Sequence, residues 1–247
     1  MTKSTEKTSE GRPSPYLPGD AAKRHMPRPG AIGFFLLAAL SVSALIFPIP
    51  TAIGGPDDLT VVRVEEDWVL TVNEPDNERA APQVATQMAP APDSPYYCIF
   101  QINHRELSQF VTWGLQVQIW YGDSNKGYKS YGSAALATTN ETVTWTQRLE
   151  KNADGYRLKF SIVAGSSFTW GNLADAGLSV KCNAIDVSPQ DISLDNYDPG
   201  YSVSNSGITF GANRVYLLQL VQVRKYRKNG SVEVDVTPRT VYQASGL

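Results

Sequence analysis

Apolar and polar residues alternate strictly in 114–121 and again in 142–147, a pattern typical of β-strands with one buried face. The apolar set of the first segment is Leu115, Val117, Ile119 and Tyr121. In the second segment, threonine takes every second position. No long 3.6-residue period follows Asp57, so the pattern predicts a β-sheet protein without long helices.

Further strands are predicted where β-branched and aromatic residues lie between turn signals. They are 60–64, 68–72, 98–103, 156–163, 167–170, 178–185 and 214–226. Residues 83–88 fit either a linker or an edge strand closed off by prolines. The number and spacing of the strands predict an all-β fold, an antiparallel β-sandwich of jelly-roll or concanavalin type over residues 60–242.

The last predicted hairpin turns at Asn229-Gly230, the strongest two-residue hairpin signal in the chain. A two-residue turn pairs 214–228 with 231–236 and places Arg224 opposite Asp235. The basic residues of the first strand then face acidic residues of the second. We interpret these charges as devices that set the register and protect a sheet edge, rather than as a lipid-headgroup site.

An uncharged segment, 29–56, precedes the predicted strands and is almost wholly apolar over 31–47. Lys23, Arg24 and Arg28 come just before it. This pattern predicts one N-terminal transmembrane or signal helix within residues 30–53, with the basic flank inside and the later residues outside the cytoplasm.

The chain is therefore expected to have five parts. They are a disordered basic cytoplasmic tail (1–29), the membrane or signal segment (30–53), a linker (54–59), the β-sandwich (60–242) and a short tail (243–247). An uncleaved anchor leaves the main domain attached to the membrane on its outer side. Cleavage after Ala52 is the alternative and gives a secreted or periplasmic protein.

The only two cysteines, Cys98 and Cys182, both follow the apolar segment. An exported domain meets an oxidising compartment, where a disulfide persists. We therefore expect a Cys98–Cys182 disulfide, with two buried free thiols as the alternative.

Charge argues against nucleic acid as a partner. The residues from Asp57 onward include 16 basic and 21 acidic ones, a net charge of −5. Affinity for nucleic acid comes largely from Lys and Arg that neutralise phosphates, and an acidic domain provides little of it.

Trp120 differs from the other tryptophans because its strand face carries Gln116 and Gln118, while the opposite face is aliphatic. An indole beside amide groups on an open sheet face can stack on a sugar ring or contact an envelope protein. We therefore predict Trp120, Gln116 and Gln118 as a carbohydrate- or partner-binding site. The alternative is that the indole is packed beneath a loop.

Acidic residues gather in one polar stretch near the end of the predicted sandwich. They are Asp186, Asp191, Asp195 and Asp198. Oxygen-rich loops of this kind can hold calcium, which makes the stretch a weak calcium candidate. The alternative is that these residues form turns. No other cofactor is expected.

Glu233 and Asp235 lie two residues apart, hence on one face of a strand. Laminarinase-like glycosidases use such a pair together with a second Glu, but Thr237-Pro238 follows here. The chain has no Gly-x-Ser-x-Gly elbow, P-loop or His-Glu-x-x-His motif. We expect no enzymatic activity, and a glycosidase is the third-ranked alternative.

In size, strand number and tryptophan-rich alternation, the chain resembles concanavalin- and laminin-G-like sandwiches. Four segments resemble uncharacterised exported proteins of planctomycete-type bacteria: 64–68 (VEEDW), 114–120 (GLQVQIW), 142–147 (TVTWTQ) and 237–241 (TPRTV). This resemblance covers most of residues 60–242 and implies a sandwich outside the cytoplasm with no known activity. The expectation is a membrane-anchored, non-enzymatic domain with a binding or structural role in the cell envelope; the alternative is a lectin-like domain assisted by calcium.

Overall fold

The structure, a computed structural model, describes residues 56–73, 82–104, 113–132, 136, 140–152, 157–183 and 192–245. All of them belong to one compact unit that spans residues 51–247. The predicted tail and membrane or signal segment, residues 1–53, lie outside the described residues. Among the helices that the structure does describe, none has the length and apolar character needed to cross a membrane.

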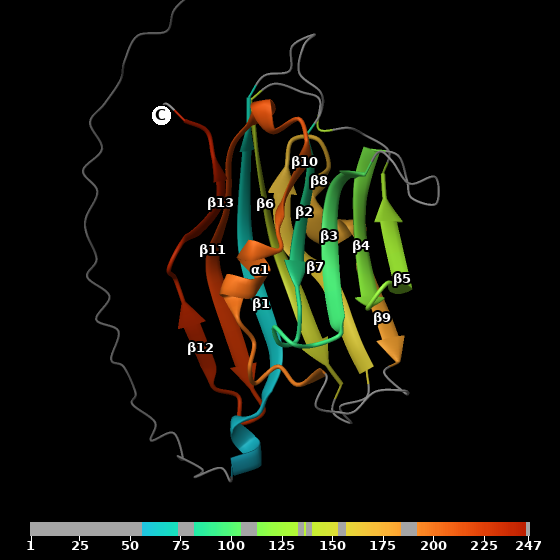
Figure 1. Ribbon diagram of the computed structural model, residues 1–247, viewed down its shortest axis with the longest axis vertical. Coiled ribbons are helices and arrows are strands. Elements are labelled where there is room, and N and C mark those ends of the chain that lie inside the picture. Colours follow the sequence, from blue (N-terminus) through green and yellow to red (C-terminus); the bar gives the residue numbers. More distant parts are fainter. Residues whose placement is uncertain are drawn as a thin grey trace, which may run out of the picture. The chain divides into compact units, whose positions relative to one another are not determined.

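Two antiparallel sheets form the fold (Figure 1). Sheet A runs in the order β12 (Val232–Asp235), β11 (Val215–Arg227), β1 (Val61–Val72), β6 (Glu141–Lys151), β7 (Arg157–Ser167) and β8 (Gly171–Asn172). In addition, β13 (Arg239–Gln243) pairs with β11, and β9 (Ser179–Asn183) pairs with β7. Sheet B runs in the order β10 (Gly207–Phe210), β2 (Gln83–Met88), β3 (Tyr96–His104), β4 (Trp113–Tyr121) and β5 (Ser124–Tyr131). The prediction of an all-β, antiparallel fold is confirmed.

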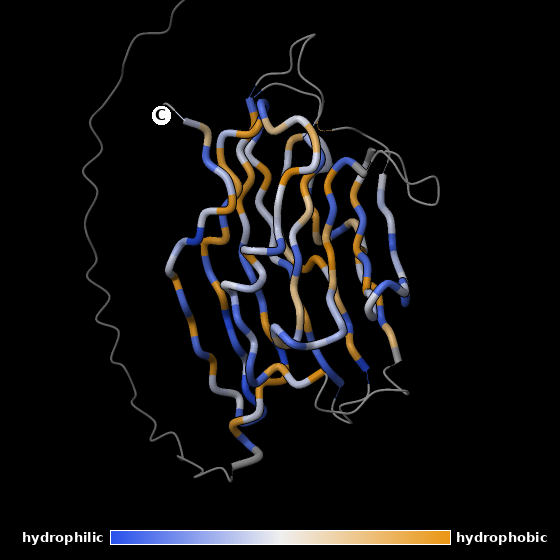
Figure 2. The backbone as a smooth tube through the Cα atoms, viewed as in Figure 1, coloured by the Kyte–Doolittle hydropathy of each residue, from blue (hydrophilic) through white to orange (hydrophobic). Residues whose placement is uncertain are grey.

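The core lies between the two sheets and follows the alternation in the sequence, which is visible along the strands in Figure 2. Leu115, Val117 and Ile119 of β4 are at most 1% exposed. Across the core, the ring of Phe100 on β3 lies 5.5 Å from that of Trp145 on β6. Each such aromatic side chain contributes about 1.5–3 kcal/mol through burial, so these inward positions hold the sheets together.

A segment between β9 and β10, residues 192–206, covers the inner face of β1 beyond the edge of sheet B (Figure 1). We call it the strap. It contains the helix α1 (Pro199–Ser204), which begins at a proline and is capped by Asp198. Short 3-10 helices are η1 (Pro56–Leu59), η2 (Leu173–Ala176) and η4 (Ala212–Arg214).

Several predicted elements differ from the observed ones. The segments 60–64 and 68–72 form one continuous strand, β1. Residues 83–88 form a strand, which was one of the two alternatives. This strand, β2, lies between β10 and β3 rather than at an edge of the sheet. Residues 168–170 are a turn, and η1 includes the last residues of the predicted linker.

The predicted register of the β11–β12 hairpin is wrong by one residue. Arg224 lies opposite Val234, and Val223 lies opposite Asp235. A two-residue turn of type I′ requires positive φ at both central residues, but of Asn229 and Gly230 only Gly230 has one, at 83°. The loop therefore has three residues, 228–230, and its glycine forms a bulge.

Candidate functional site

The outer face of sheet B brings together the three residues predicted as a binding site. Gln116, Gln118 and Trp120 alternate along β4 with the core residues, as the sequence predicts. The two glutamines are only 1% and 2% exposed, whereas Trp120 is half-buried. The two amides are thus buried, and the indole remains partly open to solvent.

Hydrogen bonds join these side chains into a row across three strands. The Trp120 Nε1–H donates to Gln118 Oε1 over 2.6 Å. Gln118 Nε2 in turn donates to Gln101 Oε1 on β3 over 2.9 Å, and to Gln116 Oε1. Gln116 Nε2 donates to Ser130 Oγ on β5 over 2.8 Å. Each amide is held in one orientation, so the row is a fixed pattern of donors and acceptors before any ligand arrives.

Tyr97 on β3 completes this face beside Trp120, directly opposite it in the register. The two rings are parallel within 3°, with their centroids 6.2 Å apart. Burial, with the negative charge of Asp123 adding to it, raises the pKa of Tyr97. The phenol is therefore a donor at neutral pH and bonds the carbonyl oxygen of Gly122 over 3.1 Å.

Tyr128 on β5 lies opposite Gln118 and is 52% exposed. We define the Trp120 face as Tyr97, Gln101, Gln116, Gln118, Trp120 and Tyr128. The sequence analysis missed Tyr97, Gln101 and Tyr128. The first two follow from alternation within 96–104, which places them opposite the buried residues of β3.

The chemistry of the Trp120 face is that of recognition. Aromatic rings stack on the apolar faces of sugar rings. The buried Gln116 and Gln118 amides hold the Trp120 indole in place, and the half-buried Gln101 is the amide of this face that a hydroxyl group can reach. Amide side chains neither carry charge nor transfer protons at neutral pH. The face therefore offers contacts to a neutral, hydroxyl-rich ligand.

The predicted calcium site comprises four aspartates, and two of them, Asp186 and Asp191, lie outside the described residues. Asp195 accepts hydrogen bonds from the backbone N–H of Val61 and from the Ser193 hydroxyl. Asp198 caps α1 through the N–H of Gly200. Within the described ranges, no group of three or more acidic, histidine or cysteine side chains is arranged to hold a metal ion.

Glu233 and Asp235 are each paired with an arginine. Glu233 bonds Arg227 over 2.8 Å, and Asp235 bonds Arg239 over 2.6 Å. The predicted Arg224–Asp235 pair is wrong, because the register places Arg224 beside β1. There it bonds both carboxylate oxygens of Asp67 and one of Glu65.

The expected disulfide is absent. Cys98 and Cys182 are free thiols, both buried, so the alternative reading is the one the structure shows. Burial raises the pKa of each thiol, most strongly at Cys98. Both cysteines therefore act as small apolar side chains of the core.

Glu66 is a buried carboxylate that the sequence analysis missed. It lies on the inner face of β1 between Val64 and Trp68 and is 0% exposed. The Trp68 indole and the Gln147 amide donate to its Oε2 over 2.9 Å and 2.6 Å, and the Tyr197 hydroxyl donates to its Oε1. Burial raises the pKa of Glu66, and the three donors oppose that shift only in part.

This network ties the strap to both sheets. The Tyr197 hydroxyl also bonds the buried Ser202 hydroxyl over 2.9 Å, both within the strap. The Gln147 amide oxygen accepts from Thr86 on β2 over 2.8 Å. Because Glu66 is enclosed and fully bonded, it stabilises the layers and has no access to a ligand.

Comparisons with known proteins add no family. No protein-family model matches the chain, and no match is found among the curated proteins. The case for a function therefore depends on the geometry of the Trp120 face.

Proposed function

We propose that the domain is a non-enzymatic carbohydrate-binding module of the cell envelope, with the Trp120 face as its binding surface. The observation that carries this proposal is the hydrogen-bonded row from Trp120 to Ser130. The row holds amides in place next to a half-buried indole and a parallel tyrosine ring. Because the row fixes the indole beside the tyrosine ring, a sugar ring can stack there without the entropy cost of ordering these side chains first.

The sequence supports the proposed location. Residues 30–53 are long and apolar enough for a membrane anchor, and their basic flank favours a domain outside the cytoplasm. A secreted or periplasmic domain after cleavage at Ala52 is the alternative. The same binding surface serves a glycan of the envelope in either case.

The two antiparallel sheets support a concanavalin- or jelly-roll-like sandwich as the finer fold class. Sandwiches of that class commonly present one sheet face to a ligand, which is the role proposed here for the outer face of sheet B. The resemblance to exported planctomycete-type proteins fits this location but implies no ligand.

The test is a panel of neutral polysaccharides titrated against the full chain in detergent micelles. Trp120→Ala removes the stacking surface, which is worth about 1–3 kcal/mol, so affinity falls about fivefold or more. Phe168→Ala is the matched control, because Phe168 is 80% exposed on the β7–β8 turn. Loss of affinity in both variants, or in neither, would overturn the assignment of the site.

A structural role is the second candidate, and one observation favours it. Val232, Val234 and Val236 are 45%, 50% and 68% exposed along the edge strand β12 and just after it. Such a row at a sheet edge can contact an envelope protein or a second copy. Sedimentation of the full chain and of Val234→Lys tests this role: concentration-dependent assembly that the lysine abolishes supports it.

A further inference from the structure

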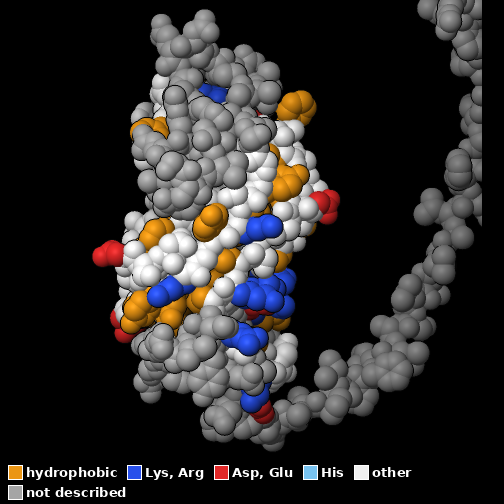
Figure 3. All heavy atoms as spheres, turned by 90° about the vertical axis from the view of Figure 1, so that its right-hand side faces the viewer, with side chains coloured by type: hydrophobic (Ala, Val, Ile, Leu, Met, Phe, Trp, Pro, Cys, Tyr) orange, Lys and Arg blue, Asp and Glu red, His pale blue; other side chains and the backbone are white. Residues whose placement is uncertain are grey.

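Lysines gather where the edges of the two sheets meet. Lys126 and Lys129 lie on β5, the edge strand of sheet B, and Lys181 lies on β9 of sheet A. All three are exposed, and none has an ion pair or hydrogen bond within the part of the chain that the structure describes. Figure 3 shows Lys and Arg side chains on this side of the domain, with hydrophobic side chains between them.

Close packing of β5 against β9 brings these lysines together. A Cβ added at Gly127 would lie 2.9 Å from a methyl carbon of Val180 and 3.8 Å from the Lys181 carbonyl oxygen, so the two strands pack closely there. Gly127 follows Lys126, and Val180 precedes Lys181 in the chain. Lys126 and Lys181 therefore lie on adjoining strands, each one residue away from this contact.

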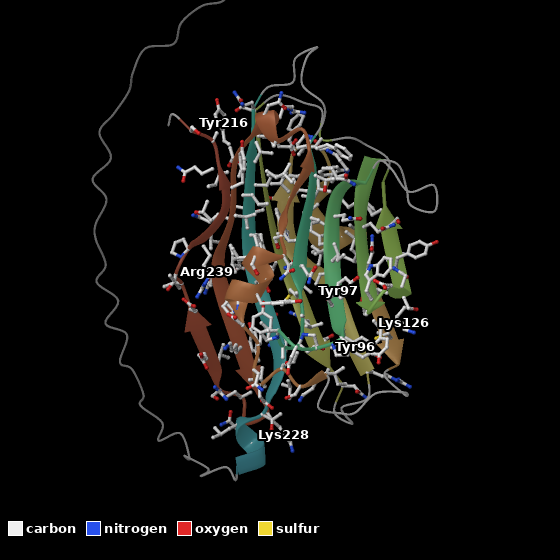
Figure 4. The ribbon with its side chains drawn as sticks, viewed as in Figure 1. Tyr96, Tyr97, Lys126, Tyr216, Lys228 and Arg239 are labelled. Atoms are coloured by element: carbon white, nitrogen blue, oxygen red, sulfur yellow. The ribbon has the colours of Figure 1, made fainter. Side chains whose placement is uncertain are left out.

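Lys126 is also the extra residue of a β-bulge. Ile119 pairs with Gly127, but Trp120 pairs with Asn125, which leaves Lys126 without an opposite residue. Bulges at sheet edges redirect a side chain. The Lys126 ammonium here lies 5.5 Å from the centre of the Tyr121 ring, near the end of β3 that carries Tyr96 and Tyr97 (Figure 4).

A fourth lysine makes the arrangement electrostatically unfavourable for the fold. Lys159 on β7 lies directly opposite Lys181, and like charges at opposite positions destabilise a sheet. Glu150 neutralises Lys159 over 2.5 Å, which leaves Lys181 uncompensated. Protection of free edges accounts for lysines on β5 and β9, but it does not require Lys181 to lie directly opposite another lysine.

We propose that the basic edge, defined as Lys126, Lys129 and Lys181, binds carboxylate groups of an acidic polysaccharide whose sugar rings lie on the Trp120 face. This inference rests on the proposed function and specifies its ligand class. Trp120 lies opposite Asn125, the neighbour of Lys126, so one polymer reaches both surfaces. The domain as a whole is acidic, so its local basic edge is not a consequence of overall charge.

The experiment titrates the full chain in detergent micelles with polygalacturonate, alginate and hyaluronate, each also in its methyl-esterified form. Esterification removes the charge and keeps the sugar backbone. The expected result is at least tenfold tighter binding of one or more charged forms, weakening as salt rises from 0.02 M to about 0.15 M because exposed charges become screened.

Two triple variants locate the effect. Lys126→Gln/Lys129→Gln/Lys181→Gln is expected to lower affinity for the charged polymer on the order of thirtyfold and to leave the esterified form unchanged. The control, Lys151→Gln/Lys225→Gln/Lys228→Gln, removes the same charge elsewhere and should change affinity less than threefold. Trp120→Ala should weaken both forms of the polymer.

Each other outcome overturns a stated part of the account. Equal affinity for charged and esterified forms overturns the carboxylate site and leaves the carbohydrate-binding function intact. An equal loss of affinity in both triple variants would show that the net charge of the domain, and not the basic edge, attracts the polymer. Equally tight, lysine-dependent binding of a DNA duplex or of anionic vesicles overturns the polysaccharide as the ligand. Binding of no glycan, neutral or acidic, overturns the proposed function itself.

Discussion

Replacing Glu66 with glutamine should leave the domain folded and change how its stability depends on pH. Glutamine has the same shape, and its carbonyl oxygen can accept from Trp68 and Gln147 as Oε2 of Glu66 does. Its amide can then donate to the Tyr197 hydroxyl, which is free to donate to Ser202 instead. Every buried polar group keeps a partner, and the buried negative charge disappears.

Alanine at the same position should behave very differently. It leaves two buried donors without an acceptor, those of Trp68 and Gln147, because the Tyr197 hydroxyl can still donate to Ser202. Each unsatisfied buried donor costs about 1–3 kcal/mol, and a small cavity adds to this. We expect Glu66→Ala to lose on the order of 4 kcal/mol at pH 7 and Glu66→Gln to stay within about 1 kcal/mol of the parent.

The sign of the pH effect follows from the raised pKa of Glu66. Above the unfolded value of 4.5, the unfolded chain loses this proton while the folded chain still holds it. The stability that Glu66 contributes is therefore complete below pH 4.5 and is lost as pH rises through the folded pKa. Glu66→Gln has no such loss, so its stability relative to the parent should increase with pH.

Glu65 works in the opposite direction and must be separated from Glu66. Burial raises the pKa of Glu65, but hydrogen bonds from Tyr226, Arg224 and Arg148 outweigh that effect and lower it. Its contribution is present above pH 4.5 and is lost as pH falls. Because both proteins retain Glu65, the difference between their stability curves isolates Glu66.

The assay is urea unfolding of parent, Glu66→Gln, Glu66→Ala and the exposed control Glu233→Gln from pH 4 to pH 8. The control should stay within about 1 kcal/mol throughout, as expected for an exposed ion pair. A flat difference between parent and Glu66→Gln across this range would refute the buried-carboxylate reasoning. So would an alanine variant as stable as the glutamine variant.

Three further predictions concern strands, charges and thiols. Gly165→Ala should lower the free energy of unfolding by on the order of 3 kcal/mol, because a Cβ there would lie 2.2 Å from the Thr144 carbonyl oxygen. Gly122→Ala, with open space around it, should cost only about 1 kcal/mol; equal losses in thermal unfolding would contradict this. Arg224→Lys should cost about 1–2 kcal/mol because lysine cannot bond Asp67 and Glu65 as the arginine fork does, and urea unfolding that shows no loss would count against the network. The melting temperature should be the same with and without reductant, and thiol labelling of the native chain should be slow; a reductant-dependent shift in mobility or melting would show that a disulfide forms.

The regular part of the fold was predictable because burial and alternation coincide there. In β4 and β6, one face meets the opposite sheet, so apolar residues fill most of the inward positions, with Gln147 as an exception, and polar residues fill most of the outward ones. The same rule placed Gln116, Gln118 and Trp120 on one face. It also predicts that Glu66 points inward with Val64 and Trp68. Three successive acidic residues, 65–67, are more typical of a solvent-exposed segment, so the sequence does not single out Glu66 as buried.

The irregular part was not predictable from local patterns. The inward positions of β5 are occupied by Gly127 and Lys129. This edge strand buries few apolar side chains, so its sequence lacks the apolar–polar alternation that predicts a strand. Turns were the alternative predicted for the acidic stretch, but at Asp198 the side-chain cap and the following Pro199 start the helix α1. The hairpin register depended on the φ angle of Asn229, which the dipeptide alone does not determine.

The most direct test of the central claim is side-chain NMR of the full chain in detergent micelles, titrated with the tightest-binding oligosaccharide of the panel. The account predicts that the indole N–H signal of Trp120 and the side-chain amide signals of Gln101, Gln116 and Gln118 shift together with one dissociation constant. The Trp68 indole signal, from a residue 1% exposed in the core, should stay in place. Saturable binding that leaves the Trp120 and glutamine signals unmoved would contradict the account.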